Sequence, residues 1–176
     1  MRLVCQADDM AEPSPWVARF ADRVPSGGRV LDVAAGGGRH TRFFLGRGHP
    51  VTVVDRDTSG VKDLQDDPGV EILELDLEVG AAWPFSGRAF EGVVVTNYLW
   101  RAILPDIVAA VAPGGVLIYE TFARGHEQFG HPHNPDFLLK PGELLEAVRE
   151  ELRVVAYEDL ILDDPPRAVQ RIAAVR

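Results

Sequence analysis

The sequence has a single cysteine, few basic residues and no long hydrophobic run. With only Cys5, the chain of 176 residues forms no internal disulfide, which is typical of proteins in a reducing cytoplasm. Apolar runs such as Val51 to Val54 are far too short to span a membrane, and residues 1–9 lack the apolar core of a secretion signal. These absences predict a cytoplasmic protein without a membrane partner.

The shortage of basic side chains disfavours a second class of partner. Lysine and arginine together number 18 against 27 aspartates and glutamates, which gives a net charge of −9 at pH 7. Because clustered lysine and arginine drive binding to phosphate backbones, we expect no nucleic-acid partner. Hydrophobic residues make up 46% of the chain, so residues 1–176 are expected to form a single domain around one core.

Strand-like and helix-like segments alternate along most of the chain. Ser14 and Pro15 predict the cap and first position of a short helix reaching Val24, within an N-terminal cap segment over residues 1–25. Strands are expected at 29–33, 51–55, 70–75, 92–96 and 116–121, and helices at 39–46, 58–65, 105–111 and 141–151. This alternation predicts an α/β fold with parallel strands.

The C-terminal part has a different pattern. Two β-type runs, 152–162 and 168–175, are joined by Asp163-Asp164-Pro165-Pro166, which is too short for a crossover helix. We therefore expect an antiparallel hairpin. The whole chain then reads as a Rossmann-like, doubly wound sheet of seven strands, mostly parallel, with one reversed strand.

A glycine-rich loop follows the first expected strand. Asp32 is followed by Val33-Ala34-Ala35-Gly36-Gly37-Gly38, and such glycines let a ligand approach the backbone closely. In these sheets ligands bind where loops leave the carboxyl ends of the strands. The dinucleotide fingerprint would place a third glycine at Thr41, and Asp32 would repel a pyrophosphate. Asp32 suits a cationic ligand group instead, such as an ammonium or a sulfonium.

Acidic residues also end the next two expected strands. Asp55 lies 19 residues after Gly36, where a carboxylate can accept hydrogen bonds from both hydroxyls of a ribose. Asp76, within Leu75-Asp76-Leu77, can accept from an exocyclic adenine amine while Leu77 covers the ring. Each acid taken alone is also compatible with an ordinary turn or strand-end role, and the ordered series favours a ligand site.

Residues 30–38 resemble motif I of the class I S-adenosylmethionine-dependent methyltransferases. Asp55 and Asp76 fall where that family has its ribose and adenine acids, and Ala112-Pro113-Gly114-Gly115 is similar to the same fold. Within the family, the run from Gly36 to Gly48 resembles the small TehB-type tellurite-resistance enzymes. The resemblance implies S-adenosylmethionine as cofactor, bound by Asp32, Ala34, Gly36, Gly38, Asp55, Arg56, Asp76, Leu77 and Asn97, where Ala34 replaces the more usual glycine.

The segment after the fourth expected strand, residues 96–101, is expected to face the transferred methyl group. We assign catalytic roles there to Asn97 and Tyr98, and Arg101 is a candidate to attract an anionic acceptor. The segment lacks the Pro-Pro-aromatic signature of enzymes that methylate exocyclic amines of nucleobases. Together with the negative charge, this favours a small-molecule acceptor.

A second segment expected at the acceptor is the long connection 122–140. Loops of this length in compact domains are usually functional, and we expect this acceptor-side loop to act as a lid that ligand orders. Its His126 is the candidate general base. His131 and His133 lack a spaced third ligand, so no metal site is expected.

The expected activity is therefore methyl transfer from a sulfonium to a small-molecule acceptor by in-line displacement. Alignment and desolvation supply much of such catalysis without a metal or a covalent intermediate. Two alternatives stay open: a non-catalytic module that binds S-adenosylmethionine, and a nicotinamide-dependent oxidoreductase, which Asp32 and Thr41 disfavour. The sequence fixes neither the acceptor nor the oligomeric state.

Overall fold

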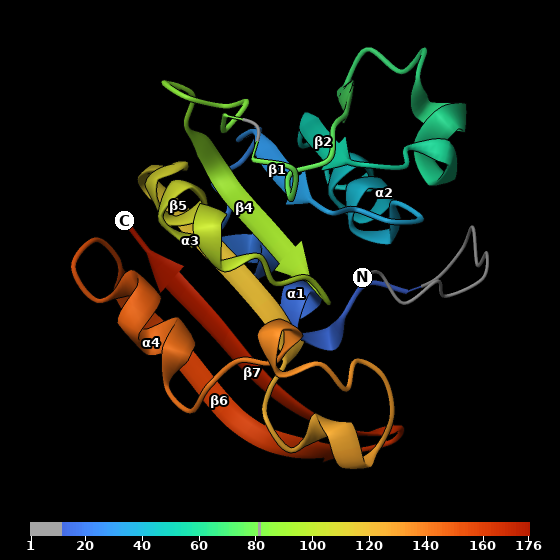
Figure 1. The fold of residues 1–176 in the computed structure, drawn as a ribbon. Helices are drawn as coiled ribbons and strands as arrows, with labels where there is room; N and C mark the ends of the chain where they lie inside the picture. Colours follow the sequence, from blue (N-terminus) through green and yellow to red (C-terminus); the bar gives the residue numbers. More distant parts are fainter. Residues whose placement is uncertain (1–11, 81) are drawn as a thin grey trace.

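A computed structural model describes residues 12–80 and 82–176 of the chain. Within them lies a seven-stranded sheet of order β3-β2-β1-β4-β5-β7-β6 (Figure 1). The strands are β1 (Val30–Val33), β2 (Val51–Asp55), β3 (Val70–Glu74), β4 (Phe90–Thr96), β5 (Val111–Phe122), β6 (Arg153–Asp163) and β7 (Pro166–Val175). β7 runs antiparallel to both of its neighbours, β5 and β6, and is the one reversed strand of this sheet. The mostly parallel sheet with a C-terminal hairpin is thereby confirmed.

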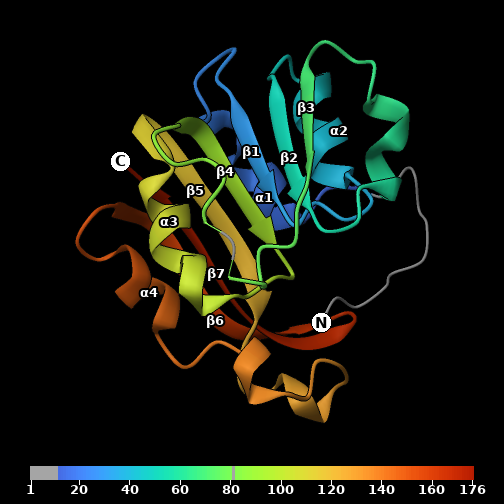
Figure 2. The ribbon, with the colours of Figure 1, turned by 45° about the horizontal axis from the view of Figure 1, so that its top comes forward.

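Helices cover both faces of the sheet, as Figures 1 and 2 show. They are α1 (Pro15–Phe20), α2 (Arg39–Gly46), α3 (Leu104–Ala109) and α4 (Glu143–Val148), with 3-10 turns η1 (Ala21–Arg23), η2 (Ser59–Leu64), η3 (Arg101–Ile103), η4 (His126–Gln128) and η5 (Pro135–Phe137). Strand side chains alternate between the two layers: Val93 and Val95 pack with α3 and α4, whereas Val94 packs with α1 and α2. The sheet is therefore doubly wound.

The start of α1 follows from its local sequence. The Ser14 hydroxyl oxygen accepts a hydrogen bond from the backbone N–H of Trp16 at 3.2 Å, and Pro15 occupies the first helical position. Trp16, Val17 and Phe20 are buried against the sheet. No helix within the described residues is long and apolar enough to cross a membrane.

Several expected boundaries are wrong. The stretch 58–65 forms only the 3-10 turn η2, and the helix expected over 141–151 is shortened to α4. The glycine-containing stop at 112–115 lies inside β5, because the pairing with β4 shifts register between Phe90 and Gly92 and absorbs the extra residues. β3 ends at Glu74, so Asp76 lies two residues beyond the strand. A turn-like sequence such as residues 112–115 cannot by itself show that the neighbouring strand, β4, will pair on both sides of the extra residues.

Candidate active site

The expected site residues converge on one edge of the sheet. β1, β2, β4 and β5 are parallel, so their carboxyl ends lie together (Figure 1). The glycine loop leaves β1 there, Asp55 ends β2, Asn97 follows β4, and the acceptor-side loop over 122–140 follows β5. In open α/β sheets this edge is where ligands bind.

The glycine loop uses left-handed backbone conformations at three alternate positions. The φ angles are +55° at Ala34, +63° at Gly36 and +75° at Gly38, which is the residue before α2. Glycine adopts this region without steric cost, whereas an alanine pays about 1 kcal/mol. Glycine would adopt this conformation freely, whereas at Ala34 the surrounding structure must hold it in place. One such contact is the Ala34 N–H, which donates to the Val54 carbonyl at 2.8 Å.

Arg42 of α2 and Gly60 of η2 contact the outer side of the glycine loop. Arg42 donates to the Gly37 carbonyl at 2.5 Å, to the Gly60 carbonyl at 3.2 Å and to the Asp63 carboxylate at 2.7 Å. A Cβ at position 60 would lie only 2.6 Å from the Gly36 carbonyl oxygen. Gly60 and Arg42 thus shape the loop, and the sequence analysis missed both; the glycine inside a helix-like stretch was the available signal.

Asp55 ties the end of β2 to the glycine loop. Its side chain is buried, with one carboxylate oxygen accepting from the Gly36 N–H at 2.9 Å and the other from the Asp57 N–H at 3.0 Å. A carboxylate oxygen has more than one acceptor position. Asp55 can therefore hold the loop and still accept from a hydroxyl of a bound ligand.

Asp32 is a buried carboxyl group at the centre of the edge. It is 2% exposed, and the hydroxyl of Thr41 donates to it at 2.7 Å. Burial raises the pKa of Asp32 to about 6, although hydrogen bonds from Thr41 act in the opposite direction. Thr41 stands where the dinucleotide fingerprint has its third glycine, so this site uses a hydroxyl that supports a carboxylate. Such a carboxylate is stabilised by a cation and opposed to a phosphate.

The residues expected around an adenine lie beyond β3. One Asp76 carboxylate oxygen accepts from the Glu78 N–H at 2.8 Å, while the Leu75 N–H donates to the Asp55 carbonyl at 2.9 Å. Leu77 is buried in the apolar cluster shared with α3 and α4, and Arg56 is exposed. The structure brings these residues beside the end of β2; their contacts with a nucleoside stay a prediction.

Asn97 begins the segment after β4 with a left-handed backbone, at a φ of +53°. Asparagine is among the non-glycine residues enriched in this region. Its side chain is exposed, and its backbone N–H donates to the Glu120 carbonyl of β5 at 3.0 Å. The turn of the chain at Asn97 is thus fixed to the neighbouring strand.

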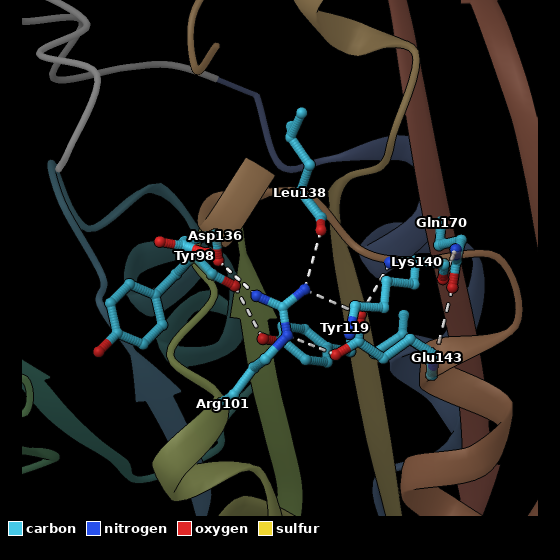
Figure 3. Close-up of polar contacts among 9 residues, drawn as sticks. Tyr98, Arg101, Tyr119, Asp136, Leu138, Lys140, Glu143 and Gln170 are labelled. Atoms are coloured by element: carbon cyan, nitrogen blue, oxygen red, sulfur yellow. Dashed lines mark hydrogen bonds and ion pairs between the residues drawn. The ribbon is translucent and has the colours of Figure 1, made fainter. Parts of the chain in front are cut away.

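Tyr98 is half-buried with its ring turned away from the Arg101 network (Figure 3). Its buried hydroxyl has no hydrogen-bond partner among the residues that the structure describes. Burial, and then the nearby carboxylates of Glu78, Asp76 and Asp55, raise the pKa of Tyr98 above its ordinary value. Tyr98 is therefore a neutral phenol that can donate a hydrogen bond, and it is unsuited to act as a base.

His126 lies inside the acceptor-side loop. It is buried, its ring stacks on Phe122 with centroids 4.2 Å apart, and its Nε2 lies 2.9 Å from the His131 carbonyl. These contacts give His126 a role in shaping the loop; its role as general base stays a prediction. His133 contacts the His131 ring and the Glu127 carbonyl. Across residues 12–80 and 82–176, no group of three or more histidine, cysteine or acidic side chains is arranged for a metal ion.

A buried polar cluster fixes the chain before α1 to this same edge. The Ser14 N–H donates to Nε2 of His40 at 3.1 Å, and the Ser14 hydroxyl donates to Glu120 at 2.8 Å. Glu120 also accepts from Arg171 at 3.3 Å, while His40 Nδ1 lies 3.5 Å from the Thr96 hydroxyl. Burial lowers the pKa of His40 to about 3, so it is neutral and accepts at Nε2. Sequence reasoning missed these contacts beyond the Ser14 cap.

Solved structures share this fold over nearly the whole chain. TehB from Haemophilus influenzae is 17% identical with a TM-score of 0.70; the match covers 94% of this chain and 63% of TehB. The 1,6-didemethyltoxoflavin-N1-methyltransferase of Burkholderia thailandensis, solved with that compound and S-adenosylhomocysteine, is 20% identical with a TM-score of 0.68, covering 92% of this chain and 76% of its own.

A third similar structure is the glycopeptide N-methyltransferase MtfA complexed with S-adenosylmethionine. It is 22% identical with a TM-score of 0.61, and the match covers 99% of both chains. No family model matches the chain, and no curated protein matches it. At these identities the likeness establishes the fold, which is that of the class I methyltransferases.

Proposed function

We propose that the protein is an S-adenosylmethionine-dependent methyltransferase that acts on a small-molecule acceptor in the cytoplasm. The observation that carries the proposal is the buried Asp32 carboxyl, supported by Thr41, at the point where a nicotinamide cofactor would place its pyrophosphate. The solved neighbours that hold S-adenosylmethionine or S-adenosylhomocysteine support the same ligand.

The cofactor would lie across the ends of β1, β2 and β4. Asp32 faces its cationic part, and Asp55 accepts from the ribose hydroxyls while holding the loop. Asp76 accepts from the adenine amine, with Leu77 and Arg56 beside the ring. The backbone at Ala34, Gly36 and Gly38 gives the close approach that their left-handed conformations allow, and Asn97 closes the site from β4.

In the proposed reaction the acceptor attacks the methyl carbon in line with the departing sulfur, and the positive charge on sulfur is lost. The protein aligns the two reactants and excludes water. Tyr98, a neutral phenol at this edge, orients the acceptor or the cofactor by donating a hydrogen bond. Asn97 is the second residue at the methyl group, and His126 is retained as the candidate base for acceptors that must lose a proton.

A small-molecule acceptor is supported by two observations. The net charge of −9 opposes the close approach of nucleic acid. Two of the solved neighbours are a 1,6-didemethyltoxoflavin-N1-methyltransferase and a glycopeptide N-methyltransferase.

Turnover tests this proposal against a binding module without activity. The wild-type protein is incubated with S-adenosylmethionine and a panel of small amines, thiols and hydroxyl compounds, and release of S-adenosylhomocysteine is measured. We expect release that depends on one compound class and is lost in Asp55→Ala. Binding of S-adenosylhomocysteine without release across the panel would favour the non-catalytic alternative.

A further inference from the structure

All three guanidinium nitrogens of Arg101 donate hydrogen bonds to other residues of the protein. It is the first residue of η3 and the last residue of the segment 96–101 that follows β4. Its Nε and Nη2 donate to the two carboxylate oxygens of Glu143 at 2.6 and 3.0 Å. Nη1 donates to the Asp136 carbonyl at 2.5 Å, and Nη2 also donates to the Leu138 carbonyl at 2.9 Å (Figure 3). The expectation that Arg101 attracts an anionic acceptor is therefore replaced by a structural contact.

Glu143 carries this contact further, into the start of α4 and into β7. It accepts from the Lys140 N–H at 2.7 Å. The Lys140 carbonyl in turn accepts from the Gln170 side chain at 2.6 Å, and Gln170 also accepts from the Leu144 N–H at 3.4 Å. Figure 3 shows these residues as one connected group. The end of the acceptor-side loop is thus fixed to three separate parts of the sheet and its helices.

The base of the loop is closed by backbone hydrogen bonds. The Leu139 N–H donates to the Phe122 carbonyl at 3.0 Å, and the Arg124 N–H donates to the Leu139 carbonyl at 3.0 Å. On the other side of the site, the Tyr119 hydroxyl donates to the Tyr98 carbonyl at 2.8 Å. The acceptor-side loop and the segment after β4 are therefore both fixed to β5, and Arg101 connects these two segments directly.

We infer that Arg101 is a positioning residue that fixes the acceptor-side loop against the segment after β4, so that the shape of the acceptor site is set before any ligand binds. What binds in that space rests on the proposed function, whereas the contact itself belongs to the free protein. Arginine suits this role because its planar fork reaches one carboxylate and two carbonyls at once. The loop is then a preformed wall, in place of the ligand-ordered lid expected from the sequence.

Hydrogen exchange of the free protein tests this directly. In Arg101→Ala, the amides of Arg124, Leu138 and Leu139 should exchange at least about tenfold faster, while amides of β1 and β4 keep their wild-type rates. Arg101→Lys keeps a charge for Glu143 but cannot reach both carbonyls, so it should restore only part of the protection. Glu143→Gln tests the same contact from its other side and should also accelerate these amides.

The matched control is Arg149→Ala, which removes an exposed ion pair between Arg149, the residue just after α4, and Glu146 of α4. It should leave the loop amides at wild-type rates. S-adenosylhomocysteine affinity, measured by calorimetry, should stay within about twofold in all four variants, which a general loss of folding would not allow.

Two results would overturn the inference. One is unchanged loop exchange in both Arg101→Lys and Glu143→Gln, variants mild enough to fold. The other is loop amides in the wild type that are unprotected until S-adenosylhomocysteine is added. Failure of the wild type to bind S-adenosylhomocysteine would count against the proposed function, while the exchange of the free protein would still decide the role of Arg101.

Discussion

The two halves of the candidate site are held together by different kinds of contact. In the cofactor half, Asp55 bonds the Gly36 N–H, 19 residues away, and Asp32 bonds Thr41, 9 residues away. In the acceptor half, Arg101 bonds Glu143 at a separation of 42 residues, and Ser14 bonds Glu120 at a separation of 106. The glycine loop and the two acids that hold it are therefore encoded within one stretch of β1-α2-β2, while the acceptor half depends on contacts between distant segments.

The largest effect should come from removing the Asp55 carboxylate. Asp55→Ala loses both the bond that shapes the glycine loop and the acceptor for the ribose. Hydrogen bonds to a charged group are worth about 1.5–3 kcal/mol each, so S-adenosylhomocysteine affinity should fall about a hundredfold. Calorimetry measures it. An unchanged affinity with an intact fold would break the assignment of this half to a cofactor.

Ser14→Ala should affect the acceptor half of the site, and it should lower the stability of the fold more than the affinity for the cofactor. It removes the cap of α1 and leaves Glu120 without its hydroxyl donor. These losses should lower the free energy of unfolding by about 2 kcal/mol, and the melting temperature by roughly 5 °C. Thermal and urea unfolding measure the change, with exposed Ser26→Ala as the control. Equal stabilities of the two variants would contradict the anchoring role of Ser14.

Gly60→Ala should displace the glycine loop from outside. The new Cβ would meet the Gly36 carbonyl oxygen at 2.6 Å and the Gly37 Cα at 2.8 Å, so the loop must move. We expect S-adenosylhomocysteine affinity to fall about tenfold, or about 1.4 kcal/mol. Gly46→Ala, where an added Cβ meets nothing within 4 Å, should bind as the wild type does. Identical titrations of the two variants would show that η2 does not shape the cofactor site.

Asp32 predicts a pH dependence of binding. Its pKa is raised to about 6 by burial, and a bound cation requires the ionised form. Affinity for S-adenosylhomocysteine should therefore be constant above pH 7 and fall about tenfold for each pH unit below 6. Asp32→Asn should remove this slope. A wild-type affinity that is flat between pH 5 and 8 would contradict the pairing of Asp32 with a cation.

The same raised pKa has an opposite effect on folding. Between pH 4 and 6 the folded state binds a proton at Asp32 that the unfolded state has released, so Asp32 makes stability fall as pH rises through this window. Above pH 6 the folded protein bears the full free-energy cost of burying the ionised Asp32 carboxylate. Asp32→Asn removes this charge and should therefore stabilise the free protein at pH 7. Urea unfolding at pH 7 checks this. A variant Asp32→Asn less stable than the wild type would mean that the Asp32 carboxylate stabilises the folded state.

The smallest effect on stability should come from Tyr98→Phe. The Tyr98 hydroxyl is buried without a partner among the described residues, so its removal breaks no hydrogen bond and should not lower the free energy of unfolding. Turnover should nevertheless fall about tenfold, since the donated hydrogen bond is made only with ligands present. A clear loss of stability with full turnover would assign Tyr98 to the core instead.

Local patterns predicted what local contacts determine. The C-terminal hairpin, the Ser14 cap and the glycine loop after Asp32 all follow from residues close in sequence. The 3-10 turn at 59–64 was expected as a helix, because the packing of Gly60 on the loop is not visible in its periodicity. The Arg101 and Ser14 contacts join residues from distant segments, and only the folded chain shows them.

The central claim is that the cofactor half binds S-adenosylmethionine or its product, and calorimetry tests it most directly. S-adenosylhomocysteine and NADH are titrated separately into the wild type and into Asp55→Asn at pH 7.5. We expect one S-adenosylhomocysteine per chain at micromolar affinity, a loss of at least about tenfold in Asp55→Asn, and no NADH binding. Micromolar binding of NADH with no binding of S-adenosylhomocysteine would contradict the account.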